Sequence, residues 1–155
     1  MRILVDADAC PVKKEIIKIA KEFKLDVLMY FDTSHEYSDG YSEVYIVDKG
    51  NDSVDLALIN KTKPKDVVVS QDYGVAALAL AKGCFVLDQF GFVFTEFNID
   101  AKLNQRAHSQ KLRKSGVRTK GPKKRKSADN DKFSKSLREL IQSINNTKVN
   151  YERGV

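Results

Sequence analysis

Two aspartates, Asp6 and Asp8, come directly after a short apolar run in the stretch ILVDADACP. In an extended chain, residues two positions apart point in the same direction, so both carboxylates face one side. Like charges this close repel each other unless a cation lies between them. The pair therefore predicts a cation site at the end of a buried strand.

Further acids follow the later apolar runs in the same way. Asp52 and Asp55 are three residues apart in an expected helix, so they share one helix face. Asp72 follows VVVS, and Asp88 follows CFVL. If the strands are parallel, all these positions lie at the carboxyl edge of one sheet, where open α/β folds bind ligands.

Carboxylate oxygens are hard ligands that select Mg²⁺ or Mn²⁺ over softer metals. Such an ion activates water and neutralises charge on a phosphoryl oxygen. The predicted metal ligands and catalytic residues are Asp6, Asp8, Asp55 and Asp72, with Asp52 as an additional candidate ligand. The structural alternative makes Asp8 and Asp52 helix N-caps and Asp72 a turn residue. Four other acids are assigned to the surface or to turns: Asp26, Asp39, Asp48 and Asp66.

The elements that would position these acids alternate along the chain. Strands are predicted at residues 2–6, 25–31, 44–47, 67–70 and 84–87, and residues 91–94 could add an edge strand. Helices are predicted at residues 11–24, 53–61 and 75–82 between them. This alternation predicts an α/β fold, a doubly wound, mainly parallel five-stranded sheet with helices on both faces.

The composition changes after residue 97. We predict one domain over residues 1–146, with a core at about 1–97 and a basic helical extension at about 98–146. The extension holds two expected helices, which begin near Asn98 and near Asp129. Residues 147–155 are expected to be a frayed tail.

Charge is distributed very unevenly. Residues 1–100 carry 11 basic and 17 acidic side chains, whereas residues 101–155 carry 16 basic and 4 acidic ones. An acidic body with a basic C-terminal region predicts a polyanion as partner, and the alternative is a solvated tail without a partner. The candidate substrate-binding residues are Arg106, Arg113, Lys114, Arg118, Tyr73 and Ser70.

Two of these candidates have specific expected roles. Arg106 follows the sheet and is expected either to hold Asp6 or Asp8 or to bind the scissile phosphate. Tyr73 could stack on a base, as aromatic residues do on single strands, or pack on the start of a helix.

The remaining features indicate a soluble cytoplasmic protein. The two cysteines, Cys10 and Cys84, lack neighbours at metal-ligand spacing and are expected to be reduced thiols. No signal peptide is visible, and no apolar run approaches the roughly 18 residues of a membrane helix.

Four stretches resemble the YaiI/YqxD family, a group of small bacterial proteins. They are VDADACPVKKEI at 5–16, KGNDSVDLAL at 49–58, SQDYGVAALALAKG at 70–83 and LRKSGVRTKGP at 112–122. That family is similar to PIN-like nucleases, whose parallel sheet gathers acids around Mg²⁺ or Mn²⁺ at its carboxyl edge.

The resemblance implies a role for each acid that it covers. Asp6 corresponds to the acid of the first strand, which Asp8 extends, and Asp55 to the acid on the middle helix. Asp72 corresponds to the acid after the fourth strand. The fourth acid of the pattern corresponds to Asp52 or Asp88.

We therefore expect a metal-dependent phosphodiesterase of the PIN-like type, a nuclease that acts on RNA. One alternative is a phosphatase that uses Asp6 as nucleophile and Asp8 as general acid, for which Ser70 is a partial further match. The other is a non-catalytic protein that binds RNA or a ribonucleoprotein through its basic region.

Overall fold

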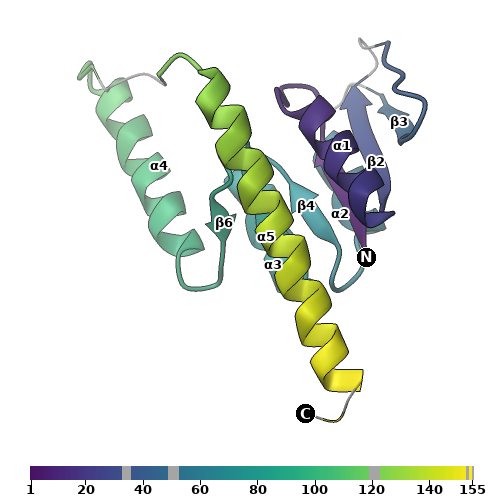
Figure 1. Ribbon diagram of the computed structural model, residues 1–155. Coiled ribbons are helices and arrows are strands. Elements are labelled where there is room, and N and C mark those ends of the chain that lie inside the picture. Colours follow the sequence, from purple (N-terminus) through teal and green to yellow (C-terminus); the bar gives the residue numbers. More distant parts are fainter. Residues whose placement is uncertain (33–35, 49–52, 119–122, 153, 155) are drawn as a thin grey trace.

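The computed structural model describes residues 1–32, 36–48, 53–118, 123–152 and 154 of the chain. Within these ranges it forms six strands and five helices (Figure 1). The strands are β1 (Arg2–Asp6), β2 (Asp26–Asp32), β3 (Glu43–Val47), β4 (Val67–Val69), β5 (Phe85–Leu87) and β6 (Val93–Phe94). The helices are α1 (Lys13–Phe23), α2 (Ser53–Lys61), α3 (Tyr73–Ala81), α4 (Ile99–Lys114) and α5 (Ser127–Glu152).

The strands form one sheet in the order β3-β2-β1-β4-β5-β6. All neighbouring strands are parallel except β5 and β6, which pair antiparallel. This confirms the predicted α/β class and mainly parallel sheet. The number of strands is corrected from five to six, because residues 93–94 pair with β5 as an edge strand.

The first helix, α1, is separated from β1 by a turn. Its apolar side chains, Ile16, Ile17 and Ile19 among them, are buried against the sheet, as their helical spacing predicts. The helix begins at Lys13, and its N-cap is Val12. The predicted N-cap role of Asp8 is therefore wrong, since Asp8 lies several residues before the helix begins.

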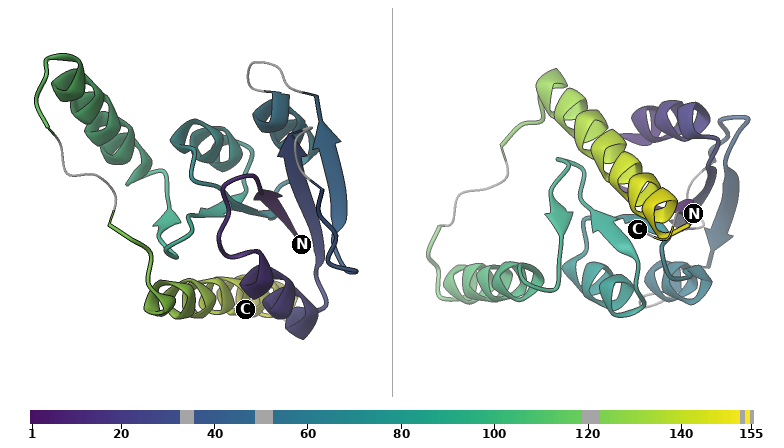
Figure 2. Two further views of the ribbon diagram at one scale, coloured as in Figure 1. Left: turned by 90° about the horizontal axis from the view of Figure 1, so that it is seen from above. Right: turned by 60° about the horizontal axis from the view of Figure 1, so that its bottom comes forward.

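Helices cover both faces of the sheet, as predicted. In Figure 2, α1 and α5 lie on one face, and α2, α3 and α4 lie on the other. Phe133, Leu137 and Ile141 of α5 are completely buried in the core cluster that α1 shares. The hydrophobic core thus extends well beyond residues 1–97, and α5 is part of it. The last helix also continues to Glu152, where residues 147–155 were expected to be frayed.

The turn between β5 and β6 contacts the backbone of α5 directly. Gly91 has φ +82°, and a Cβ built on it would lie 2.7 Å from Ser136 Cβ and 3.1 Å from the Lys132 carbonyl oxygen. Ser136 Oγ donates a hydrogen bond to the Gly91 carbonyl oxygen. Asp88 shapes the same turn, because its Oδ1 accepts from the backbone N–H groups of Phe90 and Phe92. This contact holds the β5–β6 turn against α5.

Replacing Gly91 with alanine is expected to destabilise the protein by about 2–4 kcal/mol, because the new methyl group overpacks the α5 contact and the left-handed backbone disfavours it. Urea unfolding would measure the change. Gly116→Ala is the matched control, since Gly116 has φ +85° but no atom within 4 Å of the position that a Cβ would take. An equal loss in both variants would show that backbone conformation alone accounts for the effect.

Among the residues that the structure describes, no helix combines the length and the hydropathy that a membrane span requires.

Cys10 and Cys84 are free thiols, as predicted, and both are buried.

Candidate functional site

A cleft of about 580 Å³ lies at the carboxyl edge of the sheet. Its lining residues are Asp6, Gln71, Asp72, Tyr73, Lys102, Gln105, Arg106, Ser109 and Arg113. The acidic side comes from the end of β1 and from the turn between β4 and α3. The basic side comes from one helix, α4. The cleft therefore has carboxylates on one wall and cations on the other.

Two predicted acids are held together by a serine that bridges neighbouring strands. Val5 of β1 is in register with Val69 of β4, so Asp6 and Ser70 are adjacent at the next position. Ser70 Oγ donates to Asp6 Oδ2 over 3.2 Å and accepts from the Asp72 backbone N–H over 3.0 Å. Ser70 is 1% exposed. It thus orients Asp6, and it lies outside the cleft lining, while its predicted binding role stays a prediction.

The carboxylate of Asp6 lies in an environment that disfavours its charge. Burial raises the pKa of Asp6 above its usual value. The hydrogen bond from Ser70 opposes this increase, whereas the nearby charges of Asp8 and Asp72 raise the pKa further. Three negative charges converge here, and a bound cation would relieve their repulsion.

Asp72 has a structural task as well as a place in the cleft. It is the N-cap of α3, and its Oδ1 accepts from the backbone N–H groups of Gly74 and Val75. The structural alternative for Asp72 was a turn residue, and the structure instead makes it the N-cap of α3. A carboxylate has about four acceptor positions, so capping through one oxygen leaves capacity for a ligand.

The basic wall is a stripe along α4. Lys102, Arg106, Ser109 and Arg113 are four, three and four residues apart, so they lie on one face of the helix. The Arg106 guanidinium lies over the Tyr73 ring at 5.9 Å, and Lys102 Nζ lies 4.4 Å from the centroid of Phe92. These contacts orient two cations of α4 beside the sheet edge.

The aromatic residues below α4 form a connected group. Tyr73 packs edge-on against Phe94, and Phe94 packs edge-on against Phe92. Tyr73 is the first residue of α3, and its ring packs on β6 through Phe94. Its ring also supports Arg106, which places that guanidinium in the cleft.

The other predicted acids take different positions. Asp8 lies outside the cleft lining, and both its oxygens accept from the Asp32 backbone N–H, at 3.3 and 3.1 Å. Asp55 lies in the first turn of α2, also outside the lining. Asp52 lies outside the described residues. Asp88 serves the β5–β6 turn, which leaves Asp6 and Asp72 as the acids that the cleft brings together.

The predicted basic substrate-binding residues also differ in whether they line the cleft. Arg106 and Arg113 line the cleft, whereas Lys114 and Arg118 do not. Several lining residues were not predicted from the sequence: Gln71, Lys102, Gln105 and Ser109. The spacing of Lys102, Arg106 and Arg113 along one helix face is a signal that could have identified Lys102.

The donor set of the cleft fits one common way of binding Mg²⁺ or Mn²⁺. Within the described ranges, no group of three or more histidine, cysteine, aspartate or glutamate side chains is placed to hold a metal ion. Mg²⁺, however, is usually bound by one or two carboxylates together with waters and substrate phosphates, without a complete protein cage. Asp6 and Asp72, in a cleft that is also lined by lysine and arginine side chains, fit that mode of binding.

Comparison with known proteins gives a consistent result. The model of the family described as "Uncharacterized BCR, YaiI/YqxD family" matches residues 4–143. A UPF0178 protein of Ruminiclostridium cellulolyticum is 52% identical over 137 residues, which cover 88% of this chain and 90% of the relative. UPF0178 proteins of Lachnoclostridium phytofermentans and Natranaerobius thermophilus are each 47% identical, covering 93% and 91% of this chain and 99% and 96% of those relatives. No solved structure matches the chain.

Proposed function

The chain belongs to the YaiI/YqxD family, and from the cleft that its fold builds we propose that it is a metal-dependent phosphodiesterase acting on RNA. The proposal rests on one observation: the same cleft has carboxylates on one wall and cations on the other. Asp6 and Asp72 offer oxygen ligands to a cation, and Arg106 and Arg113 offer donors to phosphate. A phosphodiester with its metal ion needs both kinds of group at once.

A PIN-like fold is part of the proposal. It is supported by the mainly parallel sheet and by the acids at the carboxyl ends of β1 and β4. The choice of RNA follows from the resemblance to PIN-like nucleases and from the basic stripe, because lysine and arginine bind the phosphate backbone without reading its sequence.

In this mechanism the chain positions the ion and the substrate. Asp6 and Asp72 would hold Mg²⁺ or Mn²⁺, and Ser70 fixes the orientation of Asp6. When bound, the ion would supply a Lewis acid that makes water a nucleophile near neutral pH and neutralises charge on phosphoryl oxygens. Arg106, supported by the Tyr73 ring, would bind the scissile phosphate or its neighbour.

The phosphatase alternative has less support. It needs Asp8 beside the substrate as general acid, but Asp8 binds the Asp32 backbone outside the cleft lining. It also needs an exposed hydroxyl, and Ser70 is buried.

The direct test of the proposed RNA cleavage is to incubate the protein with short RNAs of varied sequence, with Mn²⁺, with Mg²⁺ or with EDTA. Absence of metal-dependent cleavage across all of them would refute the proposal.

Replacing Arg106 with glutamine is expected to raise the KM for RNA about tenfold with a smaller change in kcat, because a charge-assisted contact to phosphate is lost. Steady-state kinetics with a short RNA would measure both constants. Lys114→Gln removes one charge from the same helix outside the cleft lining, so it is expected to leave KM nearly unchanged. Equal effects of the two variants would indicate general attraction and not a contact in the cleft.

A further inference from the structure

We propose that the amino-terminal edge of the sheet, opposite the cleft, carries a second surface that binds the phosphate backbone of nucleic acid. This amino-edge surface consists of Lys61, Lys63 and Lys65, which are all exposed. They lie on the segment between the end of α2 and the start of β4. Its binding is separate from the chemistry of the cleft, and only the choice of a 6-mer RNA as the ligand of the cleft in the binding test rests on the proposed function.

One residue of this segment, Lys65, has a backbone conformation that is unfavourable for lysine. The Asp66 backbone N–H donates to the Lys63 carbonyl oxygen over 3.1 Å, which closes a β-turn with Pro64 and Lys65 in its centre. Lys65 has φ +71°. Turns with a positive φ at the third position strongly prefer glycine or asparagine there. A lysine in this conformation costs stability, so its presence suggests that the side chain has a use at this point.

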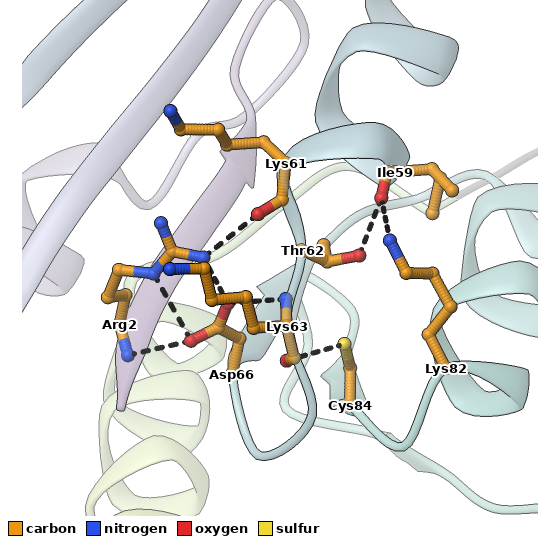
Figure 3. A network of polar contacts seen from close by, with 8 residues as sticks. All are labelled: Arg2, Ile59, Lys61, Thr62, Lys63, Asp66, Lys82 and Cys84. Atoms are coloured by element: carbon orange, nitrogen blue, oxygen red, sulfur yellow. Dashed lines mark hydrogen bonds and ion pairs between the residues drawn. The ribbon is translucent and has the colours of Figure 1, made fainter.

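The network behind the turn holds its backbone in place (Figure 3). Asp66, which is 3% exposed, accepts from the Lys63 backbone N–H over 2.9 Å and binds the Arg2 guanidinium. The Lys65 backbone N–H donates to the Gly83 carbonyl oxygen over 2.9 Å, and Cys84 Sγ contacts the Lys63 carbonyl oxygen. A backbone fixed in this way presents its cations with a smaller ordering cost on binding.

The charges at this edge are unbalanced. Asp66 is paired with Arg2, with which it forms an ion pair of 2.6 Å. In Figure 3, the Lys61 carbonyl oxygen binds Arg2, whereas the Lys61 ammonium extends away from the network. The exposed acids Asp26 and Glu43 start β2 and β3 at the same edge, but the lysines outnumber them. The surface therefore favours a ligand with several negative charges.

Helix ends explain only part of this cluster. Lys61 is the last residue of α2, and Lys82 at the end of α3 donates to the Ile59 carbonyl oxygen of α2. Cations at helix C-termini stabilise the helix dipole without any ligand. Lys63 and Lys65 lie beyond the end of α2, where the dipole effect has largely fallen off. The proposal therefore depends mainly on Lys63 and Lys65.

A second left-handed residue lies at the same edge. Lys24, with φ 56°, ends α1 two residues before β2 begins. It and Lys65 are the only non-glycine residues with positive φ among those that the structure describes. Lys24 and Lys65 precede β2 and β4, the two strands that flank β1, so both lie at the amino-terminal edge of the sheet.

The test compares a long and a short RNA. Fluorescence anisotropy, in EDTA to prevent cleavage, would follow a labelled single-stranded 30-mer and a 6-mer across a range of salt concentrations. Lys63→Gln/Lys65→Gln is expected to bind the 30-mer roughly ten- to thirtyfold more weakly at 0.1 M salt and to lower the salt slope by about 1.4. Binding of the 6-mer, which occupies the cleft, is expected to be unchanged.

Two further variants make the result decisive. Lys135→Gln/Lys148→Gln removes the same charge from exposed positions of α5 and is expected to have little effect. Lys65→Gly is expected to keep or raise the unfolding temperature while weakening binding of the 30-mer, because glycine suits the turn but lacks the charge.

Equal losses in the two double variants, an equal loss for the 6-mer, or no loss at all would overturn the proposal. Competition by polyglutamate as strong as by unlabelled RNA would assign the surface to acidic proteins and would also overturn it. The proposed cleavage is judged separately, since Lys63→Gln/Lys65→Gln is expected to cleave the 6-mer like the wild type. A wild type that binds but never cleaves would refute only the enzymatic proposal.

Discussion

Replacing Asp6 with asparagine is expected to lower metal-dependent RNA cleavage by about 10³-fold or more while leaving the protein folded. The asparagine side chain has the same shape, and its amide oxygen can still accept the hydrogen bond from Ser70. What it loses is the negative charge that would hold the ion. An ion contributes several kcal/mol to stabilising the transition state, and each 1.36 kcal/mol is tenfold in rate.

The same substitution separates a cation site from a merely structural carboxylate. Without metal, the unfolding temperature of Asp6→Asn is expected to equal or exceed that of the wild type, because a partly buried charge beside Asp8 and Asp72 is removed. With Mn²⁺, the wild type is expected to be stabilised by ligand binding and the variant much less so. Thermal unfolding at increasing Mn²⁺ concentrations would measure both effects.

The matched control is Asp88→Asn. Asp88 also follows a strand, but its Oδ1 serves the β5–β6 turn, and an asparagine oxygen can accept the same hydrogen bonds. This variant is expected to cleave RNA and respond to Mn²⁺ like the wild type. Full activity of Asp6→Asn, or equal stabilisation of that variant by Mn²⁺, would contradict the proposed metal site.

Replacing Asp66 with alanine is expected to destabilise the protein by about 3 kcal/mol, a loss as large as that expected for Gly91→Ala. Asp66 accepts hydrogen bonds from the Arg2 backbone and guanidinium and from the Lys63 backbone (Figure 3). Its removal leaves the Arg2 charge and two backbone N–H groups without this partner, and breaking a buried pair costs about 3–5 kcal/mol. The lower end applies because the Arg2 side chain is 20% exposed.

Urea unfolding would measure this loss, and the double variant Arg2→Ala/Asp66→Ala would isolate the pair. The double variant is expected to be less destabilised than the sum of the single ones, because neither charge is then left alone. Glu22→Ala is the comparison, since Glu22 and Arg138 form a bidentate pair on the exposed surface of α1 and α5. It is expected to change stability little, as exposed pairs do. Strict additivity at Arg2 and Asp66 would contradict the expected coupling.

Much of the fold could be predicted from local patterns. Most helices and strands lie within a few residues of their predicted bounds, because burial of one helix face or one strand imposes a periodicity that short stretches display. The alternation of strands and helices predicted a parallel sheet, and a parallel sheet places strand ends at one edge. For that reason the cleft positions of Asp6 and Asp72 were predictable from the sequence.

Contacts between distant segments decided the rest. Asp8 binds a backbone N–H 24 residues away, and Ser70 binds Asp6 across 64 residues. No local spacing indicates either partner, so neither hydrogen bond could be predicted from the sequence. Asp66 ends a β-turn, in line with its assignment to the surface or a turn. Its burial depends on Arg2, also 64 residues away, and was not predicted.

The sequence by itself determined which residues form strands and helices and that acids gather at the carboxyl edge, because these depend on periodicity along the chain. Only the tertiary structure decided which acids share a cleft, since that depends on strand order and on the hydrogen bonds each carboxylate makes. It also decided that one face of α4 meets Asp6 and Asp72 across the cleft. The packing of Tyr73 and the Phe92–Phe94 pair brings that helix there, and these contacts join segments that sequence patterns treat separately.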